Sequence, residues 1–330
     1  MINNKSILIT GGTGSFGKHL TLKLLKKYNP KKIVIFSRDE FKQYQFKNEV
    51  DNKYHRKLRF FIGDIRDYQR LMDALKGIDY VFHAAALKHV PALEYNPFEA
   101  VKTNVLGSQN LITACQNSKV RKLIALSTDK AAAPINLYGA TKLTADKLFV
   151  ASNNSAGNNL FAASIVRYGN VMSSRGSVIP YFQTRMNEKF LEITDLKMTR
   201  FNITLDQGIN FVLECFKKMI GGEIFVPKIP SYKITDVAKA VAPNAKMKII
   251  GIRPGEKISE EMITASDSLN TIDCGKYYII LPSKEYLEKN HTSKIIKKNK
   301  GRFCKRGFSY NSSNNNQFLK ISEIKKLLKQ

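Results

Sequence analysis

A tyrosine and a lysine four residues apart are the first side chains in this sequence whose types and spacing point to chemistry. Tyr138 and Lys142 lie in the segment NLYGATK, and residues four apart lie on one face of a helix. A lysine ammonium lowers the pKa of a nearby phenol, so Tyr138 is predicted to take a proton from a substrate hydroxyl. Such pairs also arise by chance, as a packed tyrosine with a surface lysine. Thr128, at the end of the preceding apolar run, makes the catalytic interpretation more specific.

A glycine-rich turn follows the first apolar run of the chain. Residues 10–17 read TGGTGSFG, with glycines three residues apart between an expected strand and an expected helix. Such glycines let the backbone approach a pyrophosphate at the positive end of the helix, whereas the alternative is a plain tight turn. The turn therefore predicts a dinucleotide cofactor. Its expected contacts are Gly11, Thr13, Gly14, Ser15, Phe16 and Gly17.

The end of the second apolar run indicates which dinucleotide is bound. An NAD-binding protein usually places an acidic residue there to receive the ribose hydroxyls. This chain has Ser37 and Arg38 instead, with Asp39 next to them. A hydroxyl and a guanidinium suit a 2′-phosphate, so NADP is favoured over NAD. The alternatives are a solvated Arg38 and an acceptor role for Asp39.

Further cofactor contacts are expected where the third and fourth apolar runs end. Asp64 and Ile65 are placed to touch the adenine. Ala84, Ala85 and Ala86 keep the end of the fourth run small where the cofactor passes.

Alternating apolar runs and helix-length segments must position these residues. Strand-like runs occupy 5–10, 32–36, 58–63, 79–85, 122–128 and 160–169, and helical segments are expected at 15–27, 40–50, 67–76, 97–118 and 137–155. Buried strands joined by helix-length connections indicate right-handed β-α-β units. We therefore expect an α/β fold built on a Rossmann-type, doubly wound parallel sheet, which binds ligands at the carboxyl ends of its strands.

The regular alternation ends near residue 170, where Gly and Pro become frequent and shorter elements follow. We expect a cofactor-binding Rossmann domain at 1–170, a smaller mixed α/β substrate-binding lobe at 171–283, and a basic linker with a C-terminal helix at 284–330. Residues 284–306 are rich in Lys and Arg, and 309–317 are polar and of low complexity. A mobile linker followed by a short amphipathic helix at about 319–329 is therefore predicted.

Length and composition are those of a globular protein. The chain has 330 residues, 43% of them hydrophobic, and no apolar run approaches the roughly 18 residues of a membrane span. The N-terminus lacks a signal-peptide pattern, so a cytoplasmic location is expected. The four cysteines lack metal-ligand spacing, which favours reduced thiols and predicts no metal site.

A net charge of +27 raises the question of an anionic partner. Nucleic acid and acidic membranes attract basic proteins, but the basic residues here are dispersed and no nucleic-acid-binding motif accompanies them. Solvated charge is therefore the preferred interpretation, and neither nucleic acid nor a membrane is expected as a partner.

Taken together, these segments resemble the extended short-chain dehydrogenase/reductase family, and within it the inverting UDP-N-acetylglucosamine 4,6-dehydratases of pseudaminic acid synthesis. The segments that carry the resemblance are TGGTGSFG, FSRDE, GDIRD, AAALKHVPALEYNPFEAVKTN, STDKA, INLYGATK, RYGNV, RGSVIP, ITD, MTRF and RPGEK. Three positions depart from it, at Ala133 where Asn is expected, at Asn202 where an aromatic is usual, and at Ser259 where His is common. The resemblance implies a lyase that keeps NADP bound and regenerates it in each turnover.

The pair Asp129-Lys130 separates the inverting enzymes from the retaining ones, which carry Asp-Glu at this point. The resemblance implies that neutral Lys130 removes the C-5 proton of a 4-keto sugar while protonated Asp129 helps the C-6 hydroxyl leave as water. The hydride then returns to C-6, and reprotonation on the opposite face of C-5 gives a 4-keto-6-deoxy L-arabino sugar. Lys130 then needs a lowered pKa, which a closed cleft, Lys142 and the oxidised nicotinamide favour. The alternative for Lys130 is a surface lysine after a strand.

The resemblance also implies further contacts. Asn104 is expected beside the active site, where its amide can fix Tyr138 and water. Thr128, Asp129, Lys130, Tyr138 and Lys142 are the implied catalytic residues. Further cofactor contacts are Lys88, Asn104, Tyr138, Lys142, Val171 and Arg175. The implied substrate contacts are Lys88, Asn170, Thr194, Arg200, Arg253 and Glu256, although Arg253 and Glu256 could instead pair with each other at the surface.

Several alternatives stay open from the sequence. A retaining UDP-sugar 4,6-dehydratase or a UDP-sugar 4-epimerase could use the same scaffold, and Lys130 argues against both. A non-catalytic NADP-sensing regulator would keep the glycine turn and usually lose the Tyr-x-x-x-Lys pair. Relatives form dimers or hexamers, so a homo-oligomer is expected.

Overall fold

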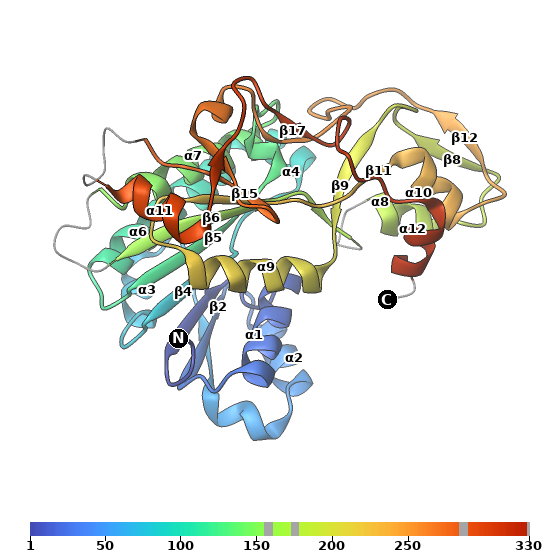
Figure 1. Cartoon of the computed structure of the whole chain (residues 1–330). Helices are drawn as coiled ribbons and strands as arrows, with labels where there is room; N and C mark the ends of the chain where they lie inside the picture. Colours follow the sequence, from blue (N-terminus) through green and yellow to red (C-terminus); the bar gives the residue numbers. More distant parts are fainter. Residues whose placement is uncertain (155–160, 173–177, 284–289, 329–330) are drawn as a thin grey trace.

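A ten-stranded sheet forms the centre of the molecule (Figure 1). The computed structural model describes residues 1–154, 161–172, 178–283 and 290–328. The sheet order is β16-β14-β15-β10-β6-β5-β4-β1-β2-β3. Its strands are β1 (Ser6–Thr10), β2 (Lys32–Ser37), β3 (Leu58–Ile62), β4 (Tyr80–His83), β5 (Lys122–Thr128), β6 (Ala162–Tyr168), β10 (Ile224–Pro227), β14 (Thr271–Asp273), β15 (Tyr277–Ile280) and β16 (Arg302–Phe303).

The strands from β3 to β10 pair in parallel, which confirms the doubly wound sheet expected from the sequence. The side chains of β1 are buried along the whole strand, because a parallel sheet is covered on both faces. On one face α1 (Ser15–Lys27) contacts α9 (Leu205–Lys218). On the other, α6 (Gly107–Gln116) contacts both α3 (Tyr68–Ala74) and α7 (Leu137–Ala151). Helix α2 (Glu40–Glu49) connects β2 to β3.

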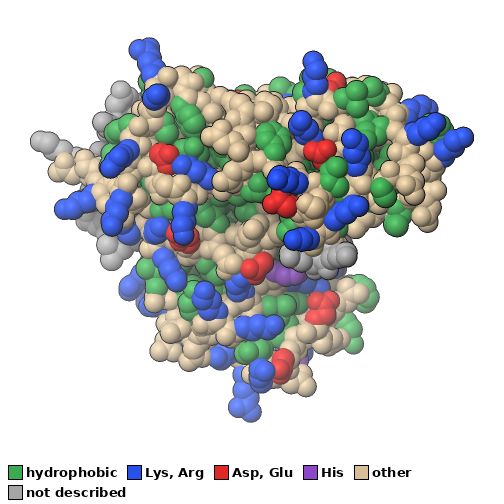
Figure 2. Space-filling view, turned by 45° about the vertical axis from the view of Figure 1, so that its right-hand side comes forward, with side chains coloured by type: hydrophobic (Ala, Val, Ile, Leu, Met, Phe, Trp, Pro, Cys, Tyr) green, Lys and Arg blue, Asp and Glu red, His purple; other side chains and the backbone are tan. Residues whose placement is uncertain are grey.

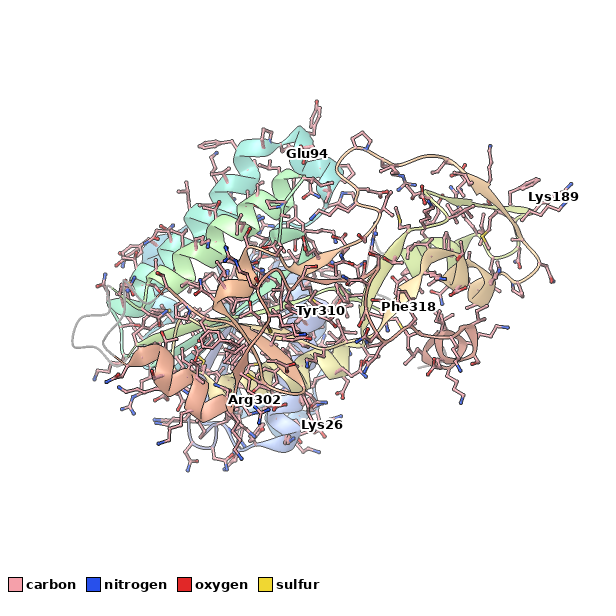
Figure 3. The ribbon with its side chains drawn as sticks, turned by 45° about the horizontal axis from the view of Figure 1, so that its top comes forward. Lys26, Glu94, Lys189, Arg302, Tyr310 and Phe318 are labelled. Carbon is pink, nitrogen blue, oxygen red and sulfur yellow. The ribbon has the colours of Figure 1, made fainter. Side chains whose placement is uncertain are left out.

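The helical segment expected at 97–118 is present but not uniform. It begins with α5 (Pro97–Ala100), passes through the wider π-helical turn η2 (Val101–Leu106), and continues as α6. The short helix α4 (Val90–Tyr95) precedes it. Glu94 on α4 accepts a hydrogen bond from the backbone of Leu137, 2.7 Å away, at the start of α7 (Figure 3). This region is thereby tied to the helix that carries Tyr138.

A smaller lobe has its own apolar core. The two-stranded parallel sheet of β8 (Phe190–Ile193) and β12 (Lys246–Ile249) is covered by α8 (Val178–Thr184), α10 (Ile234–Val241) and α12 (Ile321–Leu328). Between this lobe and the main sheet lies a three-stranded sheet of β7 (Asn170–Val171), β9 (Thr199–Ile203) and β11 (Ser231–Lys233). The C-terminal helix expected at 319–329 is α12, and it packs on α10.

The C-terminal part of the chain is more structured than the expected linker. Residues 284–289 lie outside the described residues, but 291–299 form helix α11, and β16 joins the main sheet. Helix α11 combines lysines with buried Ile295, so its charge run is the outer side of an amphipathic helix. Strand β17 (Tyr310–Asn311) then pairs with β13 (Glu261–Ile263). Residues from beyond 170 therefore complete the main sheet as well as forming the smaller lobe.

The C-terminal segment also returns from the main sheet to the smaller lobe. Arg302 lies on β16 at the edge of the main sheet, Tyr310 lies on β17, and Phe318 lies where the segment reaches the smaller lobe (Figure 3). There the backbone nitrogen of Leu319 donates to the oxygen of Ser231, 2.8 Å away. This segment therefore connects the two cores.

Lysine and arginine side chains spread over both lobes on the face shown in Figure 2. The four cysteines are free thiols. No helix in the described part of the chain is long and apolar enough to cross a bilayer.

One departure from the resembled family has a backbone explanation. Ala133 has a φ angle of 44°, in the left-handed region that alanine rarely adopts and asparagine tolerates better. An asparagine would fit this position with less strain. Ala133 lies just beyond the turn η3 (Asp129–Ala131), which follows β5.

Helix α7 approaches η3 closely because Gly139 has no side chain. A Cβ atom at Gly139 would lie 2.2 Å from the carbonyl oxygen of Lys130, far inside van der Waals contact. The glycine therefore allows the turn with Asp129 and Lys130 to sit against the first turn of the helix with Tyr138.

We expect Gly139→Ala to lower the free energy of unfolding by about 1–3 kcal/mol, because the new methyl group must push η3 and α7 apart. Urea unfolding measures the change. The matched control is Gly208→Ala in α9, where the added Cβ would meet its nearest neighbour at 3.9 Å. The control should be neutral or stabilising by up to about 1 kcal/mol. Equal stability of the two variants would contradict the close approach.

Candidate active site

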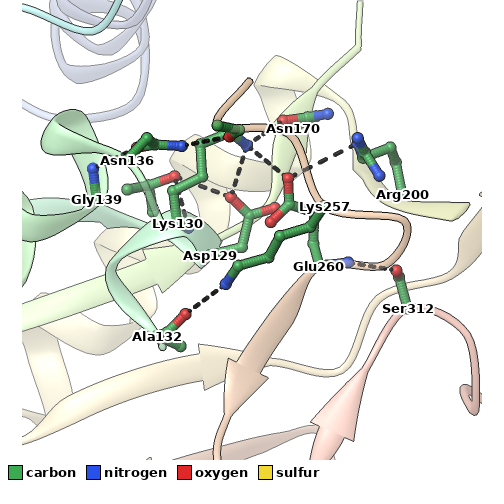
Figure 4. A network of polar contacts seen from close by, with 12 residues as sticks. Asp129, Lys130, Ala132, Asn136, Gly139, Asn170, Arg200, Lys257, Glu260 and Ser312 are labelled. Carbon is green, nitrogen blue, oxygen red and sulfur yellow. Dashed lines mark hydrogen bonds and ion pairs between the residues drawn. The ribbon is translucent and has the colours of Figure 1, made fainter. Parts of the chain in front are cut away.

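A cluster of buried charges surrounds Lys130 where β5 ends (Figure 4). Its Nζ lies 3.2 Å from Oδ1 of Asp129 and 3.1 Å from Oε1 of Glu260. It also donates to Oδ1 of Asn170, 3.4 Å away. Three separate parts of the chain, η3, β7 and the residue before β13, therefore meet at one ammonium group.

Asp129 lies at the buried side of this cluster. Its Oδ1 accepts hydrogen bonds from the hydroxyl of Thr128 at 2.9 Å and from Lys130. Among the described residues, Oδ2 has no hydrogen-bond partner. Burial raises the pKa of the Asp129 carboxyl, the charge of Lys130 opposes this rise, and the charge of Glu260 adds to it. Oε2 of Glu260 likewise has no hydrogen-bond partner among the described residues, so the balance of burial and nearby charge makes Asp129 the carboxylate more disposed to take up a proton.

Glu260 was not among the residues predicted from the sequence. It is 2% exposed, and its Oε1 contacts both Lys130 and the guanidinium of Arg200, 3.7 Å away. Burial raises the pKa of Glu260, but the charges of Lys130 and Arg200 outweigh burial and lower it. The only signal in the sequence is that Glu260 lies shortly after the segment RPGEK.

The protonation state of Lys130 differs from the expectation. Burial lowers the pKa of Lys130, but the two carboxylates Asp129 and Glu260 raise it well above its ordinary value. The expectation of a lowered pKa overlooked the second carboxylate. Lys130 is therefore a cation in the protein as it stands.

Tyr138 and Lys142 lie on one face of α7, as their spacing predicted, but their electrostatic relation differs. Burial raises the pKa of Tyr138 to about 12, while the charge of Lys130 and a hydrogen bond with Thr128 lower it. The Nζ of Lys142 instead donates to the carbonyl oxygen of Leu126, 2.7 Å away. The cation that acts on the phenol is thus Lys130, and the expected effect of Lys142 on Tyr138 is not observed.

A buried network lies behind Lys142. Burial lowers the pKa of Lys142, and the charge of Asp146, one turn further along α7, opposes this effect. Asp146 accepts a hydrogen bond from the hydroxyl of Ser127 at 2.8 Å and pairs with Arg167 at 3.1 Å. This network is not predictable from the sequence, because nothing in the spacing of these residues relates β5, β6 and α7.

The glycine turn has the geometry expected of a dinucleotide site. Gly11 has a φ angle of 64°, and a Cβ atom there would lie 2.8 Å from the backbone nitrogen of Ala85. Gly14 is the N-cap of α1 without a side-chain cap, so the first backbone N–H groups of the helix are available to an anion. Gly11 lies against the backbone of Ala84 and Ala85, and the same turn and the start of α1 carry Thr13, Ser15, Phe16 and Gly17.

The end of β2 gives each candidate there a distinct environment. The side chain of Arg38 is 56% exposed, and its Nη1 lies 3.9 Å from Oδ2 of Asp64. The hydroxyl of Ser37 accepts a hydrogen bond from Gln43. Asp39 caps α2 through the backbone nitrogen of Lys42. The carboxylate of Asp39 is therefore committed to its own helix.

Two further cofactor candidates have mainly structural contacts. Ile65 is buried, and a Cβ atom at Gly107 would lie 2.7 Å from its side chain. Asn104, on η2, exchanges hydrogen bonds of 2.8 and 2.9 Å with the backbone of Leu87 and donates to Thr141. Thr141 in turn donates to the backbone oxygen of Tyr138, so these hydrogen bonds connect Asn104 to Tyr138 through Thr141, and a direct role of Asn104 toward Tyr138 stays a prediction. Asn104 also fixes the loop that follows β4, after Ala86.

The remaining candidates occupy two regions. Lys88 lies within range of the Lys130 charge. Burial and this charge both lower the pKa of Lys88. Val171 lies on β7, and Arg175 lies outside the described residues.

Of the predicted substrate contacts at 171–283, Arg200 belongs to the Lys130 cluster. Thr194, Arg253 and Glu256 form no hydrogen bond or ion pair with this cluster among the described residues. Thr194 follows β8, and Arg253 is 56% exposed. The guanidinium of Arg253 lies 4.0 Å from Glu256, a distance at the limit of an ion pair.

Comparisons with known proteins agree with this geometry. A family model described as polysaccharide biosynthesis protein matches residues 7–282. The UDP-N-acetylglucosamine 4,6-dehydratase (inverting) of Campylobacter jejuni is 53% identical over 99% of this chain and 98% of the relative. The UDP-glucose 4-epimerase of Rickettsia akari is 41% identical over 99% of this chain and 96% of the relative.

Solved structures show the same fold. Pen from Bacillus thuringiensis has a TM-score of 0.88 and 38% identity, over 99% of this chain and 98% of that one. The dTDP-glucose 4,6-dehydratase DesIV from Streptomyces venezuelae, with NAD bound, has a TM-score of 0.66 and 21% identity, over 77% and 86% of the two chains. Because the family model covers most of the chain, and the relatives match it nearly end to end, the chain belongs to the polysaccharide biosynthesis protein family of extended short-chain dehydrogenases.

Proposed function

We propose that the protein is a configuration-inverting UDP-N-acetylglucosamine 4,6-dehydratase, a hydro-lyase that also inverts C-5. The observation that carries this proposal is the contact of Lys130 with buried Asp129 at the end of β5. This pair provides a base and an acid beside the phenol of Tyr138. The name and the 53% identity of the Campylobacter jejuni relative support the same activity.

Oxidation at C-4 prepares the sugar for elimination because a neighbouring ketone makes the C-5 proton acidic. The bound dinucleotide supplies reversible hydride storage, and Gly11, Gly14 and the first turn of α1 would hold its pyrophosphate. Tyr138, as tyrosinate, accepts the proton of the C-4 hydroxyl. The charge of Lys130 and the Thr128 hydroxyl lower the pKa of Tyr138 against burial and thereby favour this form.

Elimination needs a neutral Lys130 and a protonated Asp129, whereas the structure has the ion pair. Transfer of one proton from Nζ of Lys130 to Oδ1 of Asp129, across 3.2 Å, converts one form into the other with no change in total charge. Lys130 then takes the C-5 proton, and Asp129 protonates the departing C-6 hydroxyl. Both residues regain their original charges when water leaves. The resulting 5,6-alkene would regain the hydride at C-6, and a proton added to the opposite face of C-5 would complete the inverted 4-keto-6-deoxy sugar.

The cofactor we propose is NADP. The 56% exposed guanidinium of Arg38 can reach a 2′-phosphate, and the carboxylate of Asp39 is engaged as the α2 cap. DesIV, the more distant neighbour, holds NAD, so the choice rests on the end of β2 in this chain. Val171, Lys88 and, in the segment outside the described residues, Arg175 stay predicted cofactor contacts.

For the substrate, Asn170 is the predicted contact nearest to Lys130. Thr194, Arg253 and Glu256 stay predicted to hold the UDP part. Arg200 is also predicted to do so, although its guanidinium lies against Glu260. A cytoplasmic, homo-oligomeric enzyme of pseudaminic acid synthesis likewise remains a prediction.

A UDP-sugar 4-epimerase is the second candidate, because the Rickettsia akari relative with that name is 41% identical. An epimerase needs Tyr138 and the cofactor but gives no role to an acid and a base at C-5 and C-6. Incubation with UDP-N-acetylglucosamine followed by NMR of the product separates the two. Loss of the C-6 hydroxyl with inverted C-5 supports the dehydratase, and a 4-epimer with C-6 unchanged supports the epimerase.

We expect Arg38→Ala to weaken NADP much more than NAD, because the guanidinium pairs with the 2′-phosphate that NAD lacks. Loss of a charge-assisted hydrogen bond of about 1.5–3 kcal/mol corresponds to roughly 10–150-fold in the dissociation constant. Calorimetric titration with each dinucleotide measures this difference. Equal losses for NADP and NAD would contradict the assignment.

We expect Lys130→Ala to slow water elimination about 10²–10⁴-fold, because a positioned base is lost. Oxidation at C-4 should also slow at neutral pH, because the Lys130 charge that lowers the pKa of Tyr138 is lost, but raising the pH restores the tyrosinate. Absorbance at 340 nm from reduced cofactor should then accumulate on mixing with substrate at alkaline pH. Mass spectrometry should find little deuterium at C-5 in deuterated water.

The comparison variant for this experiment is Tyr138→Phe, which should block the earlier step and give no reduced cofactor. If Lys130→Ala turns over at the wild-type rate and its product still has an inverted C-5, another residue is the base.

A further inference from the structure

Glu260 is held rigidly at the junction of the two lobes. Its backbone nitrogen donates to the hydroxyl of Ser312 at 2.9 Å, and its backbone oxygen accepts from the nitrogen of Ser312 at 2.8 Å. The Ser312 hydroxyl in turn lies 2.8 Å from that of Thr199. The C-terminal segment and β9 thus fix a carboxylate that points at Lys130 (Figure 4).

Two carboxylates flank the Lys130 ammonium at nearly equal distances, but their surroundings differ. Glu260 has a second cation, Arg200, 3.7 Å away, whose guanidinium also donates to the backbone oxygens of Thr199 and Ile258. Asp129 is completely buried, and its charged partner is Lys130 alone among the ion pairs of the described residues. A carboxylate with two cations holds its charge more firmly than a carboxylate that shares one.

We propose that Glu260 is a positioning residue that, locked by Arg200, holds Lys130 in place and directs the Lys130 proton to Asp129. This role rests on the dehydratase function proposed above. In the transfer an N–H bond of Lys130 breaks and an O–H bond forms on Asp129, the nitrogen keeps its electron pair, and Glu260 stays a carboxylate. Asp129 thereby becomes the acid that elimination requires, and a proton is not trapped on Glu260.

Several other charged or titratable groups face Lys130 and must be included in its pH dependence. The groups are Asp129 on η3, Tyr138 on α7, Arg200 on β9, Tyr232 on β11, Lys88 after β4, and Glu260. Lys257 acts on Glu260 and donates to the backbone oxygen of Ala132, 2.9 Å away. Of these groups, Asp129 and Glu260 raise the pKa of Lys130, while Arg200 lowers it. Removing the charge of Glu260 must therefore lower that pKa.

The first test measures Lys130 directly and needs no substrate. Full-length wild-type protein and Glu260→Gln are labelled briefly with acetic anhydride at a series of pH values, and mass spectrometry quantifies acetylation of Lys130. Amines react only when neutral, so below the pKa the labelling rate rises about tenfold with each pH unit. The displacement between the two labelling curves at moderately alkaline pH therefore gives the difference between their midpoints, which report the pKa. We expect the midpoint of Glu260→Gln to lie about 1–3 pH units below that of the wild type.

The second test measures turnover of UDP-N-acetylglucosamine against pH. Activity is lost at high pH when the proton shared by Asp129 and Lys130 dissociates, so the alkaline limb of kcat/KM in Glu260→Gln should move to lower pH by a similar amount. At its own optimum we expect kcat to fall at least about tenfold, because the base is less well positioned. KM should change little, since Glu260 contacts Lys130 and Arg200 and the proposal gives it no contact with the substrate.

The matched control is Glu261→Gln, which alters the next residue. Glu261 is half-buried and lies under the influence of Lys257 and Asp267, so its loss should leave the Lys130 midpoint and the pH profile unchanged. If Glu260→Gln fails to fold, Glu260→Asp serves instead. That variant keeps a negative charge but places it further from Lys130. The shifts of the labelling midpoint and of the alkaline limb should therefore be smaller than in Glu260→Gln and in the same direction.

The outcomes separate this inference from the function on which it rests. An unchanged labelling midpoint in folded Glu260→Gln, or a shift equal to that of Glu261→Gln, overturns the role of Glu260. If the labelling midpoint shifts but the alkaline limb of kcat/KM does not, Glu260 does not direct the Lys130 proton to Asp129. Wild-type protein that leaves UDP-N-acetylglucosamine unchanged contradicts the proposed function instead, and the labelling midpoints still decide whether Glu260 holds Lys130.

Discussion

A half-buried ammonium group held between two buried carboxylates is the constraint on which the rest of the site depends. Taking charges out of water is costly unless each has partners at close range. Lys130, Asp129, Glu260 and Arg200 satisfy this requirement mutually, with ion-pair distances from 3.1 to 3.7 Å. None of the four can be placed independently, so the end of β5, strand β9 and the residue before β13 must meet.

The architecture can be understood as the means of bringing these segments together. The parallel sheet delivers Thr128 and Asp129 at the carboxyl end of β5, where such sheets place their ligands. Gly139 lets α7 approach η3, the turn that follows β5. This approach brings Tyr138 to Thr128 and within reach of the Lys130 charge. From the other side, Ser312 and Thr199 hold Glu260. The C-terminal segment therefore belongs to the support of the site, although it is far from it in sequence.

The same cluster explains how one site can supply both an acid and a base. A lone buried lysine would lose its proton, and a lone buried carboxylate would gain one. As an ion pair they hold one proton that can reside on either residue, and the surroundings decide the balance. Burial and a single cation favour a proton on Asp129, whereas the additional charge of Arg200 keeps Glu260 ionised.

Local patterns in the sequence determined a large part of this protein. Buried runs and helical segments predicted the parallel sheet, and the glycine turn, the pair Tyr138 and Lys142, and the segment with Asp129 and Lys130 are each local in sequence. These features are readable because backbone geometry and side-chain periodicity act over a few residues.

Only the tertiary structure decided the charge state of these groups and the partners of Asn104. Glu260 lies 130 residues beyond Lys130, so no spacing rule relates the two, and without it the pKa of Lys130 was expected to fall rather than rise. Likewise, the charge run at 284–306 looked like a linker because the buried side of α11 carries few residues. A pKa depends on every charge within a few ångströms and on burial, and both are properties of the folded chain.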